Sequence, residues 1–182
     1  MKIIKVPSDL PIYYAIQAEE LVDNTFGEGM FFKQTWDSSI HQWFLFYKDP
    51  FSWIERLGGY CSVQIKQEGS LGILKTSVVT MTRSGFGDKT SVVDAYSRRS
   101  GVGDAMVKHR IKWLQEQNVQ TIKSYAWFVD GVVPAQKMLM NNGFEPRDDI
   151  RGWWNKDHNK AFPCKICGEN CQCVARIFEY KD

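Results

Sequence analysis

The sequence lacks an excess of charge of either sign. Its 182 residues include 23 Lys and Arg against 21 Asp and Glu, which gives a formal net charge of +2. Proteins that read nucleic acids usually present a strongly basic surface, because Lys and Arg neutralise the phosphates. The balanced charge therefore argues against a nucleic-acid-binding protein.

Long apolar runs are also missing. No stretch approaches the roughly 20 apolar residues of a membrane-spanning helix, and the opening segment MKIIKVPSDLP lacks the apolar run of a secretory signal. We therefore expect a protein of the reducing cytoplasm, without a membrane partner. In that compartment, clustered cysteines hold a metal or stay reduced more often than they form disulfides.

What is present is the composition of a globular domain, with 43% apolar and 24% charged residues. A chain of this length typically buries roughly 70% of its unfolded surface, so it needs neither disulfides nor a metal merely to fold. We see no linker or internal repeat, and we expect a single domain over 1–182.

Alternating and apolar stretches predict the order of elements. Strands are expected at 3–6, 42–48, 60–67, 71–82, 89–97, 121–128, 151–155 and 174–180, and helices at about 11–24, 103–118 and 134–142. In the second helix Val107, Ile111 and Leu114 form the apolar face, and His109 is expected in solvent on the polar side. A meander followed by alternating helices and strands indicates a mixed α/β (α+β) domain.

The junction SVVDAYSRRSGVGDAMV carries the most informative motif. A β-rich run enters the turn 98–103 (RRSGVG), and a helix starts at once. The first N–H groups of a helix lack intrahelical partners and suit a phosphate, and glycine lets the backbone come close. The amides from Arg99 to Asp104 would then cradle a pyrophosphate, with Arg98 supplying charge or bracing the turn. An ordinary tight turn before a helix is the alternative.

Two other glycine motifs do not fit this turn. A dinucleotide fingerprint needs a third glycine where Met106 stands, and a P-loop needs Gly-Lys-Ser/Thr where Val102 is followed by Gly103 and Asp104.

The order of strand, RRSGVG turn, amphipathic helix, strand and second helix running into Asn142-Gly143-Phe144 resembles the GNAT superfamily of acyl-CoA N-acyltransferases. In that family Gln/Arg-x-x-Gly-x-Gly/Ala binds the pyrophosphate of acetyl-CoA, and Arg98, Gly101 and Gly103 occupy its fixed positions. The likeness covers about Ser91 to Glu145. It implies a central mixed, mostly antiparallel sheet flanked by helices.

The resemblance also implies a set of cofactor contacts. The backbone of Val93, Asp94 and Ala95 would pair with the pantetheine arm, and the strand 121–128 would splay from 91–97 to open a slot for the thioester. Gln136 and Lys137 on the helix 134–142 would flank the cofactor. The pyrophosphate would take its amides from the residues of the turn, Arg98, Arg99, Ser100, Gly101, Val102, Gly103 and Asp104.

Two departures from the family affect the expected chemistry. Many members have a Tyr that protonates the departing thiolate where this chain has Leu139, and a frequent Asn is Val132. The remaining acid or base candidates are Asp94 and Tyr96, for which a structural role at the strand end is the alternative. Tyr60 and Cys61 are further cleft candidates, although a buried thiol is more often inert packing.

Four of the five cysteines gather near the end of the chain, in a cysteine-rich insert at 158–174 before the last strand. They are Cys164, Cys167, Cys171 and Cys173. Four thiolates suit tetrahedral Zn²⁺, yet only three residues separate the two pairs, against roughly 15 to 20 in a zinc ribbon. A structural zinc, reduced thiols, and disulfides or a redox role all remain open, with His158 as a substitute ligand.

Together these features predict an acetyl-CoA-dependent N-acetyltransferase that acts on a primary amine by direct transfer. The alternative is an inactive acyl-CoA-binding or protein-interaction module on the same fold. The expected partners are acetyl-CoA and an amine acceptor, either a small molecule or a protein or peptide. A homodimer is left open.

Overall fold

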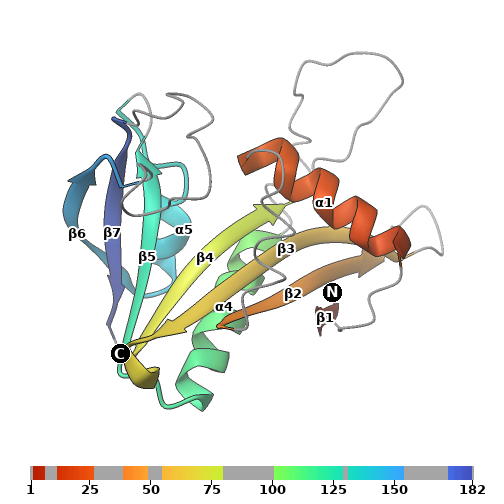
Figure 1. Ribbon diagram of the computed structural model, residues 1–182, viewed down its shortest axis with the longest axis horizontal. Helices are drawn as coiled ribbons and strands as arrows, with labels where there is room; N and C mark the ends of the chain where they lie inside the picture. The colour runs from red at the N-terminus through yellow and green to blue at the C-terminus, as the bar shows by residue number, and fades with distance from the viewer. Residues whose placement is uncertain are drawn as a thin grey trace.

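The computed structural model describes residues 2–6, 12–26, 39–48, 55–79, 101–128, 131–153 and 172–181. The elements in chain order are β1 (Lys2–Lys5), α1 (Ile12–Phe26), β2 (Ile40–Lys48), β3 (Glu55–Lys66), η1 (Gln67–Gly69), β4 (Leu71–Val79), α4 (Val102–Glu116), β5 (Thr121–Phe128), α5 (Gln136–Asn141), β6 (Phe144–Arg151) and β7 (Val174–Tyr180). This order confirms the mixed α/β class (Figure 1). The strand expected at 89–97 lies outside the described residues.

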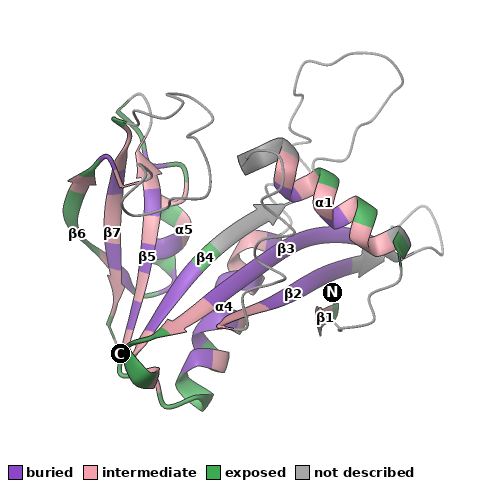
Figure 2. Ribbon diagram, viewed as in Figure 1, coloured by how far each residue is buried: buried purple, intermediate pink, exposed green. Residues whose placement is uncertain are grey.

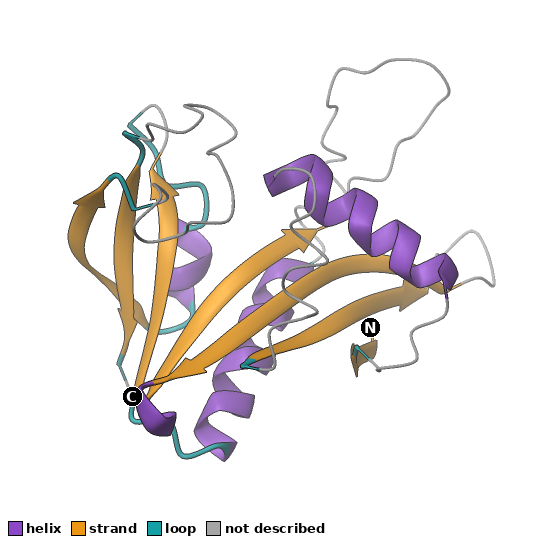
Figure 3. Cartoon of the chain, viewed as in Figure 1, coloured by secondary structure: helices purple, strands orange, loops and turns teal. Residues whose placement is uncertain are grey.

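The strands form one seven-stranded sheet in the order β1-β2-β3-β4-β5-β7-β6. Every neighbouring pair is antiparallel except β4 and β5, which run parallel because α4 crosses over between them. The sheet is thus mostly antiparallel, as expected. Helix α1 covers one face, while α4 and α5 lie on the other (Figure 3).

The parallel pair is short. Its register runs only from Leu71↔Thr121 to Leu74↔Ser124, although β4 continues to Val79 and β5 to Phe128. Beyond Leu74 and Ser124 the two strands diverge into a V (Figure 1). The fold therefore places an opening of the backbone at the C-terminal ends of β4 and β5.

Strand β2 is buried on both faces because both faces of the sheet are covered there. Trp43 and Leu45 belong to the core on the α4 side, while Phe44 and Phe46 belong to the core on the α1 side. Alternate residues of a strand point to opposite faces. The four consecutive residues from Trp43 to Phe46 are therefore all core residues.

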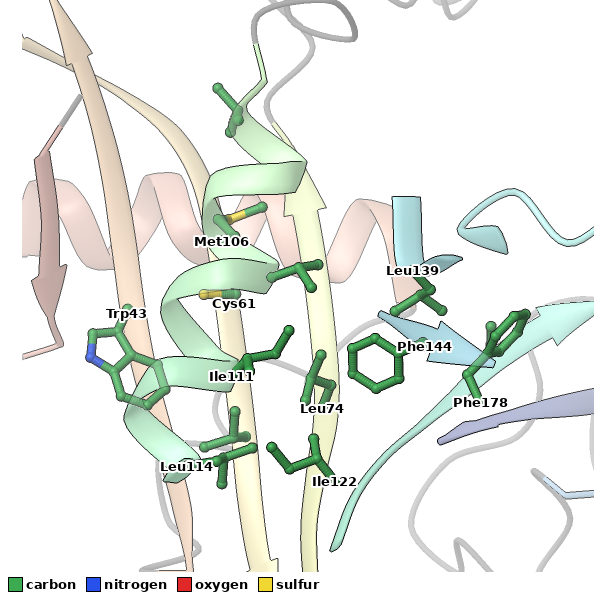
Figure 4. Close-up of a cluster of buried hydrophobic side chains, with 14 of the residues drawn as sticks. Trp43, Cys61, Leu74, Met106, Ile111, Leu114, Ile122, Leu139, Phe144 and Phe178 are labelled. Carbon is green, nitrogen blue, oxygen red and sulfur yellow. The ribbon is translucent and has the colours of Figure 1, made fainter. Parts of the chain in front are cut away.

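The larger core lies between the sheet and α4. Met106, Ile111 and Leu114 face Cys61 and Leu74, and the same cluster continues through Ile122 to Leu139, Phe144 and Phe178 (Figure 4). Buried residues accordingly follow β2, β3 and β4 and one side of α4 (Figure 2). One continuous core thus holds both arms of the V and the N-terminal turn of α4 in place.

The strand predicted at 151–155 was wrong. The strand is β6, Phe144–Arg151, and Gly152 and Trp153 form a turn after it. Strand β6 is at the edge of the sheet, four consecutive residues of it (146–149) are exposed, and its register shifts between Pro146 and Asp149. A proline and charged side chains are tolerated on an edge strand, because only one side of it needs to pair.

Candidate functional site

The turn that opens α4 adopts the left-handed conformation that glycine favours. Gly101 caps the helix with φ 76° and ψ 6°. It is exposed, and no described atom lies within 4 Å of the position that a Cβ would occupy. A side chain there would be strained. The predicted glycine turn is therefore present at Gly101, and no described residue fills the space beside it.

The first N–H groups of α4 have no partner within the helix. The first intrahelical bond runs from the Ala105 N–H to the Gly101 carbonyl, at 2.9 Å. The N–H groups of Val102, Gly103 and Asp104 precede it, so helix geometry gives them no acceptor within α4. They carry the positive end of the helix dipole, which attracts an anion.

The crossover places this turn at the open end of the V. Helix α4 leaves from the C-terminal side of β4 and returns to the start of β5, where the Gln120 and Thr121 N–H groups donate to the Ser70 carbonyl at 3.1 Å each. Its N-terminus therefore lies toward the ends at which β4 and β5 diverge (Figure 1). Ligands of open α/β sheets bind outside such carboxyl ends.

In the described part of the chain, the parallel neighbour of β5 is β4. The sequence predicted that 121–128 would diverge from 91–97, and 91–97 lies outside the described residues. In the described residues β4 and β5 have no mutual pairing beyond Leu74 and Ser124. A strand edge without a neighbouring strand can accept an extended chain as an added strand.

Asp104 makes contacts that the sequence did not predict. Its carboxylate accepts a hydrogen bond of 2.6 Å from the Asn142 Nδ2 and lies 2.8 Å from the Lys108 Nζ. Those hydrogen bonds, Lys108 first, lower the pKa of Asp104 below its usual range. The carboxylate is thus charged at neutral pH, and it belongs to the first turn of α4.

Three solved structures share this arrangement of strands and helices. A GNAT family acetyltransferase from Elizabethkingia anophelis with acetyl-CoA bound has a TM-score of 0.65 at 13% identity, over 100% of this chain and 97% of that chain. The aminoglycoside 6′-N-acetyltransferase from Enterococcus faecium has a TM-score of 0.63 at 11% identity, over 99% of this chain and 96% of that chain. The ribosomal-protein-S18-alanine N-acetyltransferase from Escherichia coli has a TM-score of 0.61 at 14% identity, over 98% of this chain and 92% of that chain. This chain has the GNAT fold.

The likeness is one of fold, because no family model and no curated protein matches the sequence. It confirms the resemblance read from the motif at the level of fold. Within the GNAT fold, the described part of the predicted cofactor set is Gly101, Val102, Gly103 and Asp104. Val102 is 3% exposed and belongs to the core, so it can offer a ligand only its backbone.

The remaining predicted residues of this site lie outside the described residues. They are the cofactor residues Val93, Ala95, Arg98, Arg99 and Ser100 and the catalytic candidates Asp94 and Tyr96.

Leu139, at the position where many GNAT members carry a tyrosine, is a core residue. It is 2% exposed and packs in the same cluster as Phe144 and Phe178. Val132, which replaces the frequent Asn, is 60% exposed. Neither side chain can transfer a proton, so neither can serve as an acid or a base.

Tyr60 and Cys61 are packing residues and not cleft residues. Both are buried, and they point to opposite faces of β3. The Tyr60 hydroxyl donates to the Gln42 Oε1 at 2.8 Å, and burial raises its pKa. Burial also raises the pKa of the Cys61 thiol to about 11, which keeps it a thiol and a poor nucleophile at neutral pH.

The prediction that His109 is a solvated surface residue was wrong. Its ring lies edge-on to Trp43, with centroids 5.2 Å apart, and its Nε2 is buried. Trp113, one turn further along α4, also contacts Trp43, with ring centroids 5.1 Å apart. His109 therefore packs against β2.

The cysteine-rich insert falls almost wholly outside the described residues. Of its four cysteines only Cys173 is described; it is half-buried, and its carbonyl accepts the Gly152 N–H at 2.8 Å just before β7. Over the described ranges, no three His, Cys, Asp or Glu side chains form a group that could hold a metal ion. Among the described helices, none is long and apolar enough to cross a membrane.

Proposed function

We propose that this chain is an acetyl-CoA-dependent N-acetyltransferase that passes an acetyl group directly to a primary amine. The observation that carries the proposal is the glycine turn at Gly101, which presents the first amides of α4 at the end of the sheet where β4 and β5 diverge. The GNAT fold and the Arg98-x-x-Gly101-x-Gly103 sequence support the same ligand. Solved relatives of the fold that hold acetyl-CoA or CoA support it further.

The proposed chemistry needs little from side chains. The amine nitrogen attacks the thioester carbonyl, a C–N bond forms, the C–S bond breaks, and the CoA thiolate leaves and takes up a proton. A thiolate is a good leaving group, so holding the amine close to the carbonyl supplies much of the acceleration. The amine must lose a proton, and Asp94 or Tyr96 is the proposed acceptor. Leu139 cannot protonate the departing thiolate, so the thiolate takes its proton from water or from Tyr96.

The proposed cofactor contacts follow the sequence of the turn. The amides from Arg98 to Asp104 bind the pyrophosphate, and the backbone of Val93 and Ala95 pairs with the pantetheine arm. The proposed compartment is the reducing cytoplasm, and the proposed acetyltransferase domain spans 1–182. The acceptor belongs to the class of primary amines, in a small molecule, a peptide or a protein.

Turnover tests this function directly. Release of CoA thiol from acetyl-CoA is measured with a panel of polyamines, aminoglycosides and peptides with free N-termini, and mass spectrometry identifies the acetylated product. We expect acceptor-dependent thiol release, and a loss of about 100-fold or more in kcat for Asp94→Asn or Tyr96→Phe if either is the base. Acetyl-CoA binding without turnover on any acceptor would contradict catalysis and favour an inactive acyl-CoA-binding module, the alternative that Leu139 motivates.

We also propose that Cys164, Cys167, Cys171 and Cys173 hold a structural zinc ion. Their number and the Cys-x-x-Cys spacing of the first pair support it. Protein purified under reducing conditions is expected to contain about one zinc per chain, as a closed tetrahedral Cys₄ site binds one ion. A zinc content near zero would contradict this proposal. Thiol titration would then show whether the four cysteines are reduced or form disulfides.

A further inference from the structure

Asp104 poses an electrostatic problem for an enzyme that binds a pyrophosphate. Its carboxylate belongs to the first turn of α4, where its own N–H is among those without an acceptor in the helix. An acidic side chain stabilises a helix N-terminus, but it competes with an anionic ligand for the same positive end of the dipole. Since Asp104 is charged at neutral pH, the protein must hold its carboxylate away from the bound phosphates.

The carboxylate is held from a different element. Asn142, at the C-terminal end of α5, donates from Nδ2 to the Asp104 Oδ1 at 2.6 Å and to the Met138 carbonyl at 2.8 Å. Both neighbours are acceptors, so the amide must present its nitrogen to them. This contact joins residues 38 positions apart and links α5 to the first turn of α4.

The Asn142 side chain is committed to this contact. The residue is 8% exposed, and its Oδ1 is buried without a hydrogen-bond partner among the described residues. Burying an amide carbonyl without a hydrogen-bond partner costs stability. If the Asn142 side chain contributed only packing, the protein would be more stable with that amide exposed to solvent. On the other side, the Lys108 Nζ neutralises the same carboxylate at 2.8 Å, one turn along α4.

We propose that Asn142 is a positioning residue for the cofactor. Its amide fastens the Asp104 carboxylate to the end of α5, which fixes the first turn of α4 and keeps the negative charge beside Asn142 and Lys108 rather than over the amides of 102–104. This inference rests on the proposed function, because it concerns the pyrophosphate of the same ligand. It adds a residue that the glycine motif does not contain.

The sharpest variant is Asn142→Asp. It places a carboxylate against two acceptors, the Asp104 Oδ1 and the Met138 carbonyl, and so releases Asp104. The matched control is Asn141→Asp, which adds the same charge at the neighbouring, exposed residue of α5. Asn142→Ala removes the donor without adding charge, and it serves if the aspartate variant does not fold.

The binding of CoA and of acetyl-pantetheine, which lacks the pyrophosphate, is measured for each variant by calorimetry. Removing a hydrogen bond to a charged group predicts a rise of about tenfold in the Kd for CoA in Asn142→Asp, and about fivefold in Asn142→Ala. Asn141→Asp should match the wild type. The Kd for acetyl-pantetheine should not change, and the KM for acetyl-CoA should rise while kcat stays constant.

The double variant Asn142→Asp/Asp104→Asn restores a donor and an acceptor with their roles exchanged, and it should recover part of the lost affinity. A merely structural role for Asn142 would lower the melting temperature without distinguishing CoA from acetyl-pantetheine, which would overturn the inference. Equal CoA affinity in Asn142→Asp and wild type would overturn it as well. Failure of the wild type to bind CoA at all would instead remove the proposed function, and with it this role.

Discussion

His109 is a residue whose packing helical periodicity does not predict. On α4 it follows Lys108 and precedes Arg110, in the part of the helix that the pattern assigns to solvent. In the fold, its ring packs on Trp43 of β2, and burial lowers its pKa below the ordinary value of 6.5. The ring of His41 lies against that of Trp113, with centroids 4.5 Å apart. Burial also lowers the pKa of His41, and the positive charge of Lys5 lowers it further.

These two histidines predict how stability depends on pH. The folded-state pKa lies below 6.5, so the unfolded chain binds the proton first as the pH falls. The contribution of the two neutral histidines to the free energy of unfolding is therefore complete above about pH 6.5, and it is lost as the pH falls through their folded-state pKa values. Glu116 opposes the shift at His109, and Arg110 and Lys112 support it.

Urea denaturation between pH 8 and pH 5 measures this effect. We expect the free energy of unfolding of the wild type to decrease as the pH is lowered from 8 to 5. The decrease should be less steep in His109→Gln, because glutamine does not titrate. Carboxylates such as Asp104 titrate in both proteins, so the difference between the two curves isolates the histidine. Parallel curves over the whole range would contradict the assignment of a buried, neutral His109.

At the scale of elements, the close approach of β4 to α4 depends on one glycine. A Cβ on Gly72 would lie 2.7 Å from the Leu114 Cδ2 and 3.1 Å from the Val119 Cγ1. Strand β4 is an arm of the V, and Gly72 is within its short pairing with β5. A larger residue at 72 must therefore push α4 away from the sheet or distort the base of the V.

Gly72→Val is accordingly expected to lower the free energy of unfolding by about 1–3 kcal/mol, as overpacking of a filled core does. Denaturant unfolding monitored by tryptophan fluorescence gives the value. The contact with Leu114 is checked by a double-mutant cycle, in which Gly72→Val should cost less in a Leu114→Ala background. Strictly additive effects would show that the two residues do not meet.

The elements that the sequence predicted best have clear apolar patterns within their own segments. The expected strands at 121–128 and 174–180 match β5 and β7, because apolar and β-branched residues fill both and turn residues flank them. The pattern of Val107, Ile111 and Leu114 predicted the buried face of α4, although not the buried Arg110 among them. Strand β6 was misplaced because an exposed edge strand with Pro146 and two aspartates has no apolar pattern.

At the scale of the whole molecule, the local part of the site was predictable and the long-range part was not. The turn at Gly101 follows from its own sequence, since the glycine spacing and the helix start are adjacent in the chain. The parallel pairing of β4 with β5 depends on how distant strands meet, and no local pattern in either strand indicates it. Asn142 belongs to the Asn142-Gly143-Phe144 motif, but its contact with Asp104 spans 38 residues, and no local signal indicates it.

Binding of acetyl-CoA at the N-terminus of α4 is what the whole interpretation depends on. Gly101→Val tests it against a matched control, Gly69→Val, in the η1 turn between β3 and β4. Both glycines have positive φ, 76° and 95°, and neither has a described atom within 4 Å of an added Cβ, so the two variants carry a similar backbone strain. Gly69 adjoins Ser70, whose carbonyl meets the start of β5, away from the open end of the V.

Isothermal titration with acetyl-CoA, with melting temperatures measured beside it, decides the question. We predict one-to-one binding with equal Kd for the wild type and Gly69→Val, and a Kd raised by about tenfold or more for Gly101→Val, as expected when charge-assisted hydrogen bonds to the backbone are lost. No binding to the folded wild type, or the same Kd in all three proteins, would contradict a cofactor site at the start of α4.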